Sequence, residues 1–441
     1  MSGCGHSASE IFARGCPGYS LDDVIFLPGY IDFSLDAVTF LTALSPRVQL
    51  RTPLVSHPAV TGARMATAMA LMGGLGVVGG CVESQVVAVT KVKRFENGFI
   101  HDPVTLPPTA KVSDVDQINT KYGFSTVPVV DAEHKLLGLV TARDIDFISD
   151  RHLTDLPQVM TPVDKLVTLT YPVALADANA KLREAKVGKL PIVDAEGKLV
   201  SLVSRNDLLK NKEYPLASKD ANKQLLVGAS VEVGNIPTDI SDHVLKLVQA
   251  GVDLLFLEGP VTAQVEVVKA IRCAHPEISI LASDVASIYE LAALAEAGVH
   301  AITVTASRAQ AVAIFQLADF ARTRGVAVVG NPGVRNSGHI VKTLGLGADA
   351  VMVNRLFQST TEERGNDGVR PTTKADDSGK GSVMKLVPYY MQGAKHGLQD
   401  RGARSRQELH GLLHSGQLRM AIRSGNAVKE GNVHDLVIFK N

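Results

Sequence analysis

The feature that most constrains the fold is an internal repeat in the middle of the chain. Residues 127–133, Val-Pro-Val-Val-Asp-Ala-Glu, recur as residues 190–196, Leu-Pro-Ile-Val-Asp-Ala-Glu, at an offset of 191 − 128 = 63 residues. The same offset relates Asp114 to Asp177 and, without a gap, residues 141–144 to residues 204–207. Repetition at a fixed spacing indicates a duplicated structural unit. Each unit predicts a short strand, a helix, two apolar strands joined by an Asp-Ala-Glu turn, and a second helix.

The two units together, residues 101–213, resemble a pair of CBS motifs, which form a Bateman domain and bind adenine or guanine nucleotides in a central cleft. In that family a Thr/Ser-x-x-Asp motif opens a helix, its carboxylate accepting hydrogen bonds from ribose and its hydroxyl and helix N-terminus meeting phosphate. The resemblance implies ATP or GTP in the cleft. The implied binding residues are Thr141, Asp144, Lys189, Ser204 and Asp207. The alternative is that Thr141 and Ser204 cap their helices and the two aspartates support the first turns.

The rest of the chain alternates apolar strands with amphipathic helices, which is typical of a parallel sheet covered by helices. Three helix-to-strand junctions look alike, and each carries a glycine that fits a helix C-cap: Gly251, Gly298 and Gly347. Strands are expected at 254–257, 279–282, 301–304, 327–329 and 350–353, and near 52–55 and 76–78. The pattern predicts an α/β fold, a (β/α)8 TIM barrel with an inserted tandem CBS domain. The barrel is expected from residues 1–100 and 214–441, the second part including a C-terminal segment, and the CBS domain from residues 101–213.

Charge and cysteine content narrow the classes of function. Lysine plus arginine and aspartate plus glutamate both number 45, so there is no basic field to attract nucleic acid non-specifically. No segment has the 18 or so uninterrupted apolar residues of a membrane span. The four cysteines form no Cys-x-x-Cys pair, which argues against a zinc site and a disulfide framework. We therefore expect a cytoplasmic protein without a metal site and without a membrane or nucleic-acid partner.

Five stretches resemble the IMP dehydrogenase/GMP reductase family, in particular eukaryotic IMP dehydrogenase. They are residues 27–33, 93–98, 214–220, 336–342 and 408–416. The resemblance runs from about Gly18 to the C-terminus and puts the CBS insertion where the family has it. It implies tetramers that pair into octamers. It also implies oxidation of IMP to XMP with NAD, through a covalent adduct on a cysteine in a Gly-Ser-x-Cys loop after a barrel strand.

The residues that this chemistry requires are missing at the matching positions. The strand at 301–304 runs into Thr-Ala-Ser-Arg-Ala-Gln-Ala at 305–311, which contains no cysteine, and Ser307 is expected to cap a helix. The family's flap carries an Arg-Tyr pair that activates water, whereas residues 361–381 contain no tyrosine, and the nearest candidate is Arg370, followed by Pro371. Losing one member of a covalent catalytic set typically costs about 10⁴ to 10⁶ in turnover. No catalytic residue is therefore assigned.

Ligand positions at the strand ends also depart from the family. Residues 331–333, Asn-Pro-Gly, replace Asp-Gly-Gly, so that one amide donor is lost, and Asn354-Arg355 replaces a Gly-Ser backbone nest by a bulky cation. Residues 258–261, Glu-Gly-Pro-Val, stand where the family has Asp-Ser-Ser-Gln, the segment that meets NAD.

Three functions follow from these observations. The favoured one is an IMP dehydrogenase-like pseudoenzyme that binds purine nucleotides through its CBS pair and regulates, or assembles with, enzymes of GMP biosynthesis. It would be a homo-oligomer or a hetero-oligomer with an active IMP dehydrogenase. The second is a barrel enzyme of altered chemistry that holds an anionic ligand with Asp284, Asn331, Gly333, Asn354 and Arg355. The third is an active IMP dehydrogenase-family oxidoreductase, with NAD as its cofactor.

Overall fold

The structure is a computed structural model. It describes residues 5–13, 17–93, 95, 99–101, 103–122, 126–171, 173, 175–204, 214–234, 238–304, 307–331, 333–363 and 380–427. The chain forms two compact units, one from Met1–Lys93 together with Leu216–Asn441, and one from Arg94–Pro215.

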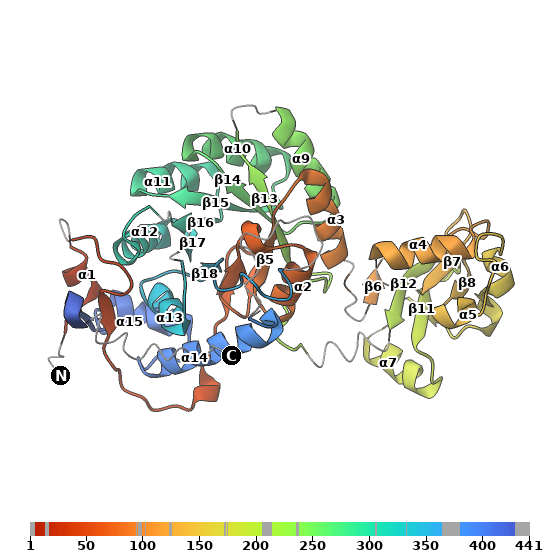
Figure 1. Ribbon diagram of the computed structural model, residues 1–441, viewed down its shortest axis with the longest axis horizontal. Helices are drawn as coiled ribbons and strands as arrows, with labels where there is room; N and C mark the ends of the chain where they lie inside the picture. Colours follow the sequence, from red (N-terminus) through yellow and green to blue (C-terminus); the bar gives the residue numbers. More distant parts are fainter. Residues whose placement is uncertain are drawn as a thin grey trace. The chain divides into compact units, whose positions relative to one another are not determined.

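The first unit is built on a closed barrel of parallel strands in the order β13-β14-β15-β16-β17-β18-β4-β5 (Figure 1). The strands are β4 (Leu54–Ser56), β5 (Leu75–Val78), β13 (Val227–Glu232), β14 (Leu254–Glu258), β15 (Ser279–Val285), β16 (Ala301–Val304), β17 (Ala327–Gly330) and β18 (Ala350–Val353). Apolar side chains such as Leu75, Val77, Phe256 and Met352 fill its core. Parallel strands buried on both faces need such continuous apolar runs. The predicted (β/α)8 TIM barrel is confirmed.

Helices surround the barrel strands in Figure 1. They are α2 (Ala63–Leu71), α3 (Val82–Lys93), α9 (Thr238–Gln249), α10 (Val261–Ala274), α11 (Ile288–Ala297), α12 (Gln310–Arg324), α13 (Ser337–Gly345), α14 (Val383–Gln399) and α15 (Arg406–His414). Short elements complete this unit: α1 (Ala8–Ile11), η1 (Leu35–Ala37), η2 (Pro58–Val60), the pair β2 (Thr42–Ala43) and β3 (Gln49–Leu50), and the antiparallel pair β1 (Val24–Phe26) and β19 (Met420–Ile422). In the described part of the chain, no helix is long and apolar enough to cross a membrane.

The three similar helix-to-strand junctions share one arrangement at the N-terminal ends of the barrel strands: a glycine with positive φ, and a hydrogen-bond acceptor two residues later. Gly251, Gly298 and Gly347 all have positive φ, as the C-cap prediction requires. Two residues after each glycine, a side chain accepts a hydrogen bond from the start of the preceding strand. Asp253 accepts from the Val227 amide at 2.8 Å, His300 from the Ile280 amide at 3.1 Å, and Asp349 from the Val328 amide at 2.8 Å.

A buried ion cluster lies where the chain leaves and re-enters the first unit. Lys93, the last residue of α3, places its Nζ 2.9 Å from Asp220 Oδ2 and 2.7 Å from Asp253 Oδ2. The Lys93 side chain is only 6% exposed. Since Asp220 follows the inserted residues and Asp253 precedes β14, the cluster ties both ends of the insertion to the barrel rim.

The second unit consists of two small sheets and their helices. One sheet has the order β7-β8-β9 and the other β10-β11-β12-β6. Its elements are β6 (Phe99–His101), α4 (Val112–Tyr122), β7 (Val127–Val130), β8 (Leu136–Val140), α5 (Ala142–Ile145), α6 (Leu156–Val159), β9 (Thr161–Pro162), η3 (Val163–Lys165), β10 (Leu169–Thr170), α7 (Leu175–Glu184), β11 (Lys189–Val193) and β12 (Leu199–Ser204).

The sequence repeat appears in this unit as a structural repeat in register. Leu106 bridges Val129 in the first half, and Leu169 pairs with Ile192, each 63 residues later, in the second. The halves also bond reciprocally: the Leu136 amide donates to the Gly197 carbonyl at 3.1 Å, and the Leu199 amide donates to the His134 carbonyl at 3.0 Å. The offset of 63 relates 136 to 199 and 134 to 197. The two halves of the inserted unit therefore meet through a local pseudo-twofold contact.

Candidate functional site

The structure brings the predicted barrel residues to one end of the barrel. Asp284 lies near the end of β15, Asn331 directly follows β17, and Asn354 and Arg355 directly follow β18. Gly333, with a φ of 63°, lies in the same connection as Asn331. Because the barrel strands are parallel, all five positions are at their C-terminal ends, where barrel enzymes keep their chemistry.

Among the described residues, however, no hydrogen bond joins any two of these five. The Asn354 Oδ1 accepts from Gln358 Nε2 at 3.4 Å, the Asp284 amide donates to Thr303 Oγ1 at 3.1 Å, and the Arg355 side chain is exposed. The structure therefore places the predicted residues at one end without assembling them into a hydrogen-bonded set.

Asp284 has an unusual backbone conformation. Its φ of 55° is in the left-handed region, which a non-glycine residue adopts at a cost of about 1–3 kcal/mol. The register between β15 and β16 shifts between Ala282 and Val285, which marks an irregularity around Asp284. Bulges of this kind re-aim side chains next to active sites. Here the Asp284 side chain is exposed between the buried Ser283 and Val285.

Carboxylates gather at this end of the barrel. Glu232 ends β13, Glu258 ends β14, and Asp284 is in β15. Burial raises the pKa of Glu258, and the neighbouring charges of Glu232 and Asp284 raise it further, against a hydrogen bond with Ser230 that lowers it. Like charges that shift one another's titration must lie close together. Sequence reasoning missed Glu232, although a charged residue ending the apolar run 227–231 was a usable signal.

His57, in the connection after β4, belongs to the same end. Burial lowers the pKa of His57, and the charge of Asp284 partly offsets this. Its Nδ1 accepts a hydrogen bond from the Ala59 amide at 3.1 Å. Its ring lies edge-on to the Phe256 ring, with 6.3 Å between the ring centroids. A neutral imidazole near the Asp284 carboxylate can exchange protons and bind hydroxyl or cationic groups, and it adds no charge that would attract phosphate. Within the described ranges, no group of three or more His, Cys, Asp or Glu side chains could hold a metal ion.

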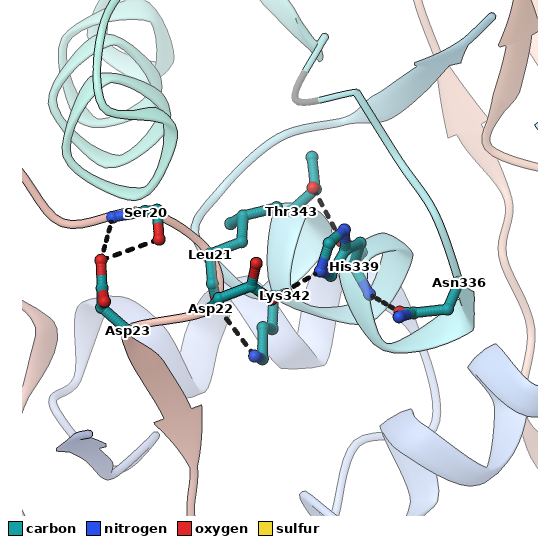
Figure 2. A network of polar contacts seen from close by, with 8 residues as sticks. All are labelled: Ser20, Leu21, Asp22, Asp23, Asn336, His339, Lys342 and Thr343. Atoms are coloured by element: carbon teal, nitrogen blue, oxygen red, sulfur yellow. Dashed lines mark hydrogen bonds and ion pairs between the residues drawn. The ribbon is translucent and has the colours of Figure 1, made fainter. Parts of the chain in front are cut away.

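The helix after Asn331 and Gly333 is held by the N-terminal segment of the chain, as Figure 2 shows. In the first turn of α13 the His339 Nε2 lies 2.9 Å from Asp22 Oδ1, and one turn later Lys342 Nζ donates to the Leu21 carbonyl at 2.7 Å. Partial burial works to raise the pKa of Asp22, but the hydrogen bond and charge of His339, together with Lys342, lower it. These polar contacts join α13 to the N-terminal segment.

The connection that corresponds to the family's cysteine loop is short. β16 ends at Val304 and α12 begins at Gln310. The N-cap of α12 is Ala309, without a side-chain hydrogen bond, so the predicted capping role of Ser307 is wrong. The carbonyl of Tyr19 accepts a hydrogen bond from the Ala311 amide at 3.2 Å, which places the N-terminal segment over the start of α12. Residues 305–306, Arg370 and Pro371 lie outside the described residues.

The predicted nucleotide residues of the inserted unit are described only in part. Asp144 Oδ2 accepts hydrogen bonds from the Thr141 amide and the Thr141 hydroxyl, both at 2.8 Å, at the start of α5. This is the helix-capping arrangement that the sequence left open beside nucleotide binding. Lys189 begins β11 and Ser204 ends β12, whereas Asp207 lies outside the described residues. The nucleotide role of this set stays a prediction.

Comparisons with known proteins agree on one family. The model described as "IMP dehydrogenase / GMP reductase domain" matches residues 18–375. The chain is 38% identical to an inosine-5'-monophosphate dehydrogenase of Toxoplasma gondii over 99% of this chain and 98% of that protein. It is 35% identical to the enzyme of the same name from Schizosaccharomyces pombe, over 96% and 93%. A solved GMP reductase variant from Trypanosoma brucei in complex with guanosine 5'-monophosphate superposes with a TM-score of 0.83 at 26% identity, over 96% of this chain and 99% of that one.

Proposed function

The chain belongs to the IMP dehydrogenase/GMP reductase family, and from this membership we propose that it is a nucleotide-binding pseudoenzyme. It binds ATP or GTP through the inserted repeats, which act as a CBS pair, and its barrel no longer performs the dehydrogenase reaction. Purine nucleotides are the ligand class that the family supports, and one solved neighbour is a GMP reductase in complex with guanosine 5'-triphosphate. The observation that carries the proposal is a sequence repeat that keeps both Thr/Ser-x-x-Asp motifs, in a chain without the family's cysteine at residues 305–309.

The inserted unit supports nucleotide binding by its symmetry. Its halves repeat the same bridges at an offset of 63 and meet through the reciprocal bonds at residues 134–136 and 197–199. Both halves have an Asp turn in which Oδ1 accepts two amides, from residues 133 and 135 for Asp131 and from residues 196 and 198 for Asp194. In the sequence, the same offset relates the two Thr/Ser-x-x-Asp motifs, Thr141–Asp144 and Ser204–Asp207.

The barrel supports loss of the chemistry at two points. Residues 305–309 alone connect β16 to α12, and no cysteine occurs among them. The strand ends of β13, β14 and β15 carry the carboxylates of Glu232, Glu258 and Asp284. Coulomb repulsion disfavours a phosphate dianion or a pyrophosphate beside such a group. At the segment expected to meet NAD, Pro260 has no amide hydrogen to donate to that cofactor.

A protein that binds purine nucleotides without catalysing a reaction can act as a regulator. A cytoplasmic nucleotide sensor of this kind would act by assembling with enzymes of GMP biosynthesis, as a homo-oligomer of four or eight chains or as a hetero-oligomer with an active IMP dehydrogenase. The second candidate is an active IMP dehydrogenase-family oxidoreductase, because the curated relatives at 31–38% identity carry that name over nearly their full length.

The test is calorimetric titration of the full chain with ATP, GTP, GMP, IMP and NAD. It is repeated on the double substitution Asp144→Ala with Asp207→Ala. The matched control is Asp114→Ala with Asp177→Ala, a pair at the same offset. In the control, Asp114 Oδ2 accepts from the Lys111 amide at 2.9 Å, a helix cap like that of Asp144, so both variants lose a comparable structural contact.

We expect ATP or GTP to bind the wild type and the control, to lose at least about tenfold in affinity in the Asp144/Asp207 variant, and IMP and NAD to give no heat. Equal nucleotide binding by the two variants would refute the assigned residues. IMP and NAD binding, followed by reduction of NAD in the presence of IMP, would refute the pseudoenzyme and establish the oxidoreductase.

A further inference from the structure

A cavity of about 280 Å³ opens between α12 and α15, at the end of the barrel where the strands begin. Small residues in its wall leave the space open. Ala43, Ala318, Gly325 and Gly347 line it, and none has a side chain beyond Cβ. A Cβ on Gly347, whose φ is 103°, would lie 2.9 Å from the Ala318 Cβ, so a larger residue is excluded at this junction. The space therefore results from the backbone packing of two helix ends.

Nitrogen-bearing side chains converge on this cavity from both helices. Arg322 comes from the last turn of α12, and Arg406, His410 and His414 come from α15. The charged groups that face them are Asp349, before β18, and Asp319 of α12. Arg406 forms an ion pair with Asp349, whose other carboxylate oxygen accepts from the Val328 amide. The Asp349 carboxylate is thus already bonded at both oxygens.

His410 is a fixed part of the cavity wall. Its Nε2 donates to the carbonyls of Leu344 and Ala348 at 3.0 and 3.1 Å, and its Nδ1 faces Arg406 Nη1 at 3.4 Å. Two carbonyl acceptors require the hydrogen on Nε2, which leaves Nδ1 as an acceptor. Burial, reinforced by the charge of Arg406, lowers the pKa of His410 to about 4. The ring is neutral and holds Arg406 in place.

In the cavity, the nitrogen donors that remain outnumber the carboxylate oxygens that could accept from them. Arg406 Nε is buried without a partner among the described residues. Arg322 is 59% exposed, and its Nη2 lies 3.7 Å from Asp319 Oδ1. The same oxygen lies 3.7 Å from His414 Nδ1, so one distant carboxylate serves both groups. At that distance neither contact is a formed hydrogen bond, and both side chains are available to a ligand.

We propose that this cavity binds a small oxyanion of the phosphate class, as free phosphate or as the phosphate group of a small phosphomonoester. Arg322 and His414 contact the oxyanion, and Arg406 forms the cationic wall behind it. Arginine suits this ligand because its planar fork presents several donors to an oxyanion. The volume lies just below the range of about 300–1,000 Å³ for drug-sized ligands, which suits a ligand no larger than a sugar phosphate. The site does not depend on the proposed function.

The test is calorimetric titration of the full chain with inorganic phosphate at constant ionic strength. The test variants are Arg322→Gln and His414→Asn. The matched control is Arg324→Gln, which removes the same charge from the same last turn of α12 but whose guanidinium lies over the Phe320 ring at 5.5 Å. We expect one phosphate per chain, at least about tenfold weaker binding in Arg322→Gln, weaker binding in His414→Asn, and unchanged binding in Arg324→Gln.

Two further titrations identify the ligand and separate this site from the inserted unit. Ribose 5-phosphate that binds more tightly than phosphate identifies a phosphomonoester ligand, and phosphate binding alone identifies the free ion. The Asp144→Ala, Asp207→Ala variant must bind phosphate like the wild type, which separates this site from the inserted unit. No phosphate binding, or equal binding by the wild type and Arg322→Gln, would overturn the proposal and leave the cluster as a brace for α15.

Discussion

Substitution of Lys93 by methionine removes the cation that two carboxylates at the barrel rim, Asp220 and Asp253, share. Methionine keeps most of the aliphatic stem, so the packing of the lysine side chain changes little while its charge is lost. Removing one partner of a buried ion pair costs about 3–5 kcal/mol, because it leaves an uncompensated buried charge. We expect a loss of this size in the free energy of unfolding at pH 8.

The loss should depend on pH in a defined direction. Burial raises the pKa of Asp253 to about 6, against the opposing effects of Lys93 and the Val227 amide. An aspartate whose pKa is higher when folded binds its proton more tightly in the folded state, so stability falls as the pH rises from 3.8 to about 6. That difference corresponds to about 3 kcal/mol. Without Lys93 the pKa of Asp253 rises further, so the Lys93→Met penalty is largest above pH 7 and shrinks toward pH 5.

The measurement is the urea midpoint of the wild type and Lys93→Met between pH 5 and 8, followed by far-UV circular dichroism because the chain has no tryptophan. Hydrogen exchange of β14 peptides localises the effect to the barrel. The control, Lys91→Met, changes an exposed lysine of α3 and should stay within about 0.5 kcal/mol of the wild type. Adding Asp253→Asn to Lys93→Met should recover part of the loss at pH 8. A pH-independent penalty, or a double variant no more stable than the single one, would refute the reasoning.

Two further substitutions and one control substitution test the packing of α13 and α15. Since the pKa of His410 is lowered from 6.5 to about 4 by burial and Arg406, the unfolded chain binds the proton first, and stability falls by about 3 kcal/mol as the pH drops through this window. His410→Gln should flatten that part of the pH profile, and an unchanged slope would count against it. Gly345→Ala should cost about 1–3 kcal/mol by overpacking, because its Cβ would collide with the Phe26 ring, whereas Gly411→Ala in α15 meets nothing and should be neutral or stabilising in thermal unfolding.

The sequence predicted those parts of the fold that local pattern determines. The apolar runs and glycine junctions predicted the barrel, and the repeat at 63 residues predicted equivalent pairings in the two halves of the inserted unit. The strand-end residues were located correctly because the C-terminal ends of parallel strands must share one end of a barrel. Their mutual arrangement could not be predicted, since it depends on features such as the positive φ of Asp284.

Contacts between residues far apart in the chain were not predictable from one sequence. Lys93 is 127 residues from Asp220 and 160 from Asp253, and no local pattern links them. The Arg406–Asp349 pair is likewise set by how α15 docks against β18. Ser307 fails for a related reason: a serine near a helix start favours capping, but the chain path places Ala309 at that position.

The two ends of the barrel contribute differently to stability: the contacts that stabilise the fold lie at the strand N-termini, and the repelling carboxylates lie at the C-termini. At the strand N-termini, Asp253, His300 and Asp349 each close the barrel by bonding the preceding strand, and the ion clusters of Lys93 and Arg406 build on two of these residues. At the C-termini, Glu232, Glu258 and Asp284 repel one another, so they contribute nothing comparable to folding. Because the stabilising contacts lie at the strand N-termini, residues at the C-terminal ends can change, and the chemistry with them, without loss of the fold. A folded, stable chain is therefore no indication of activity, and only ligand binding and turnover distinguish a sensor from an enzyme.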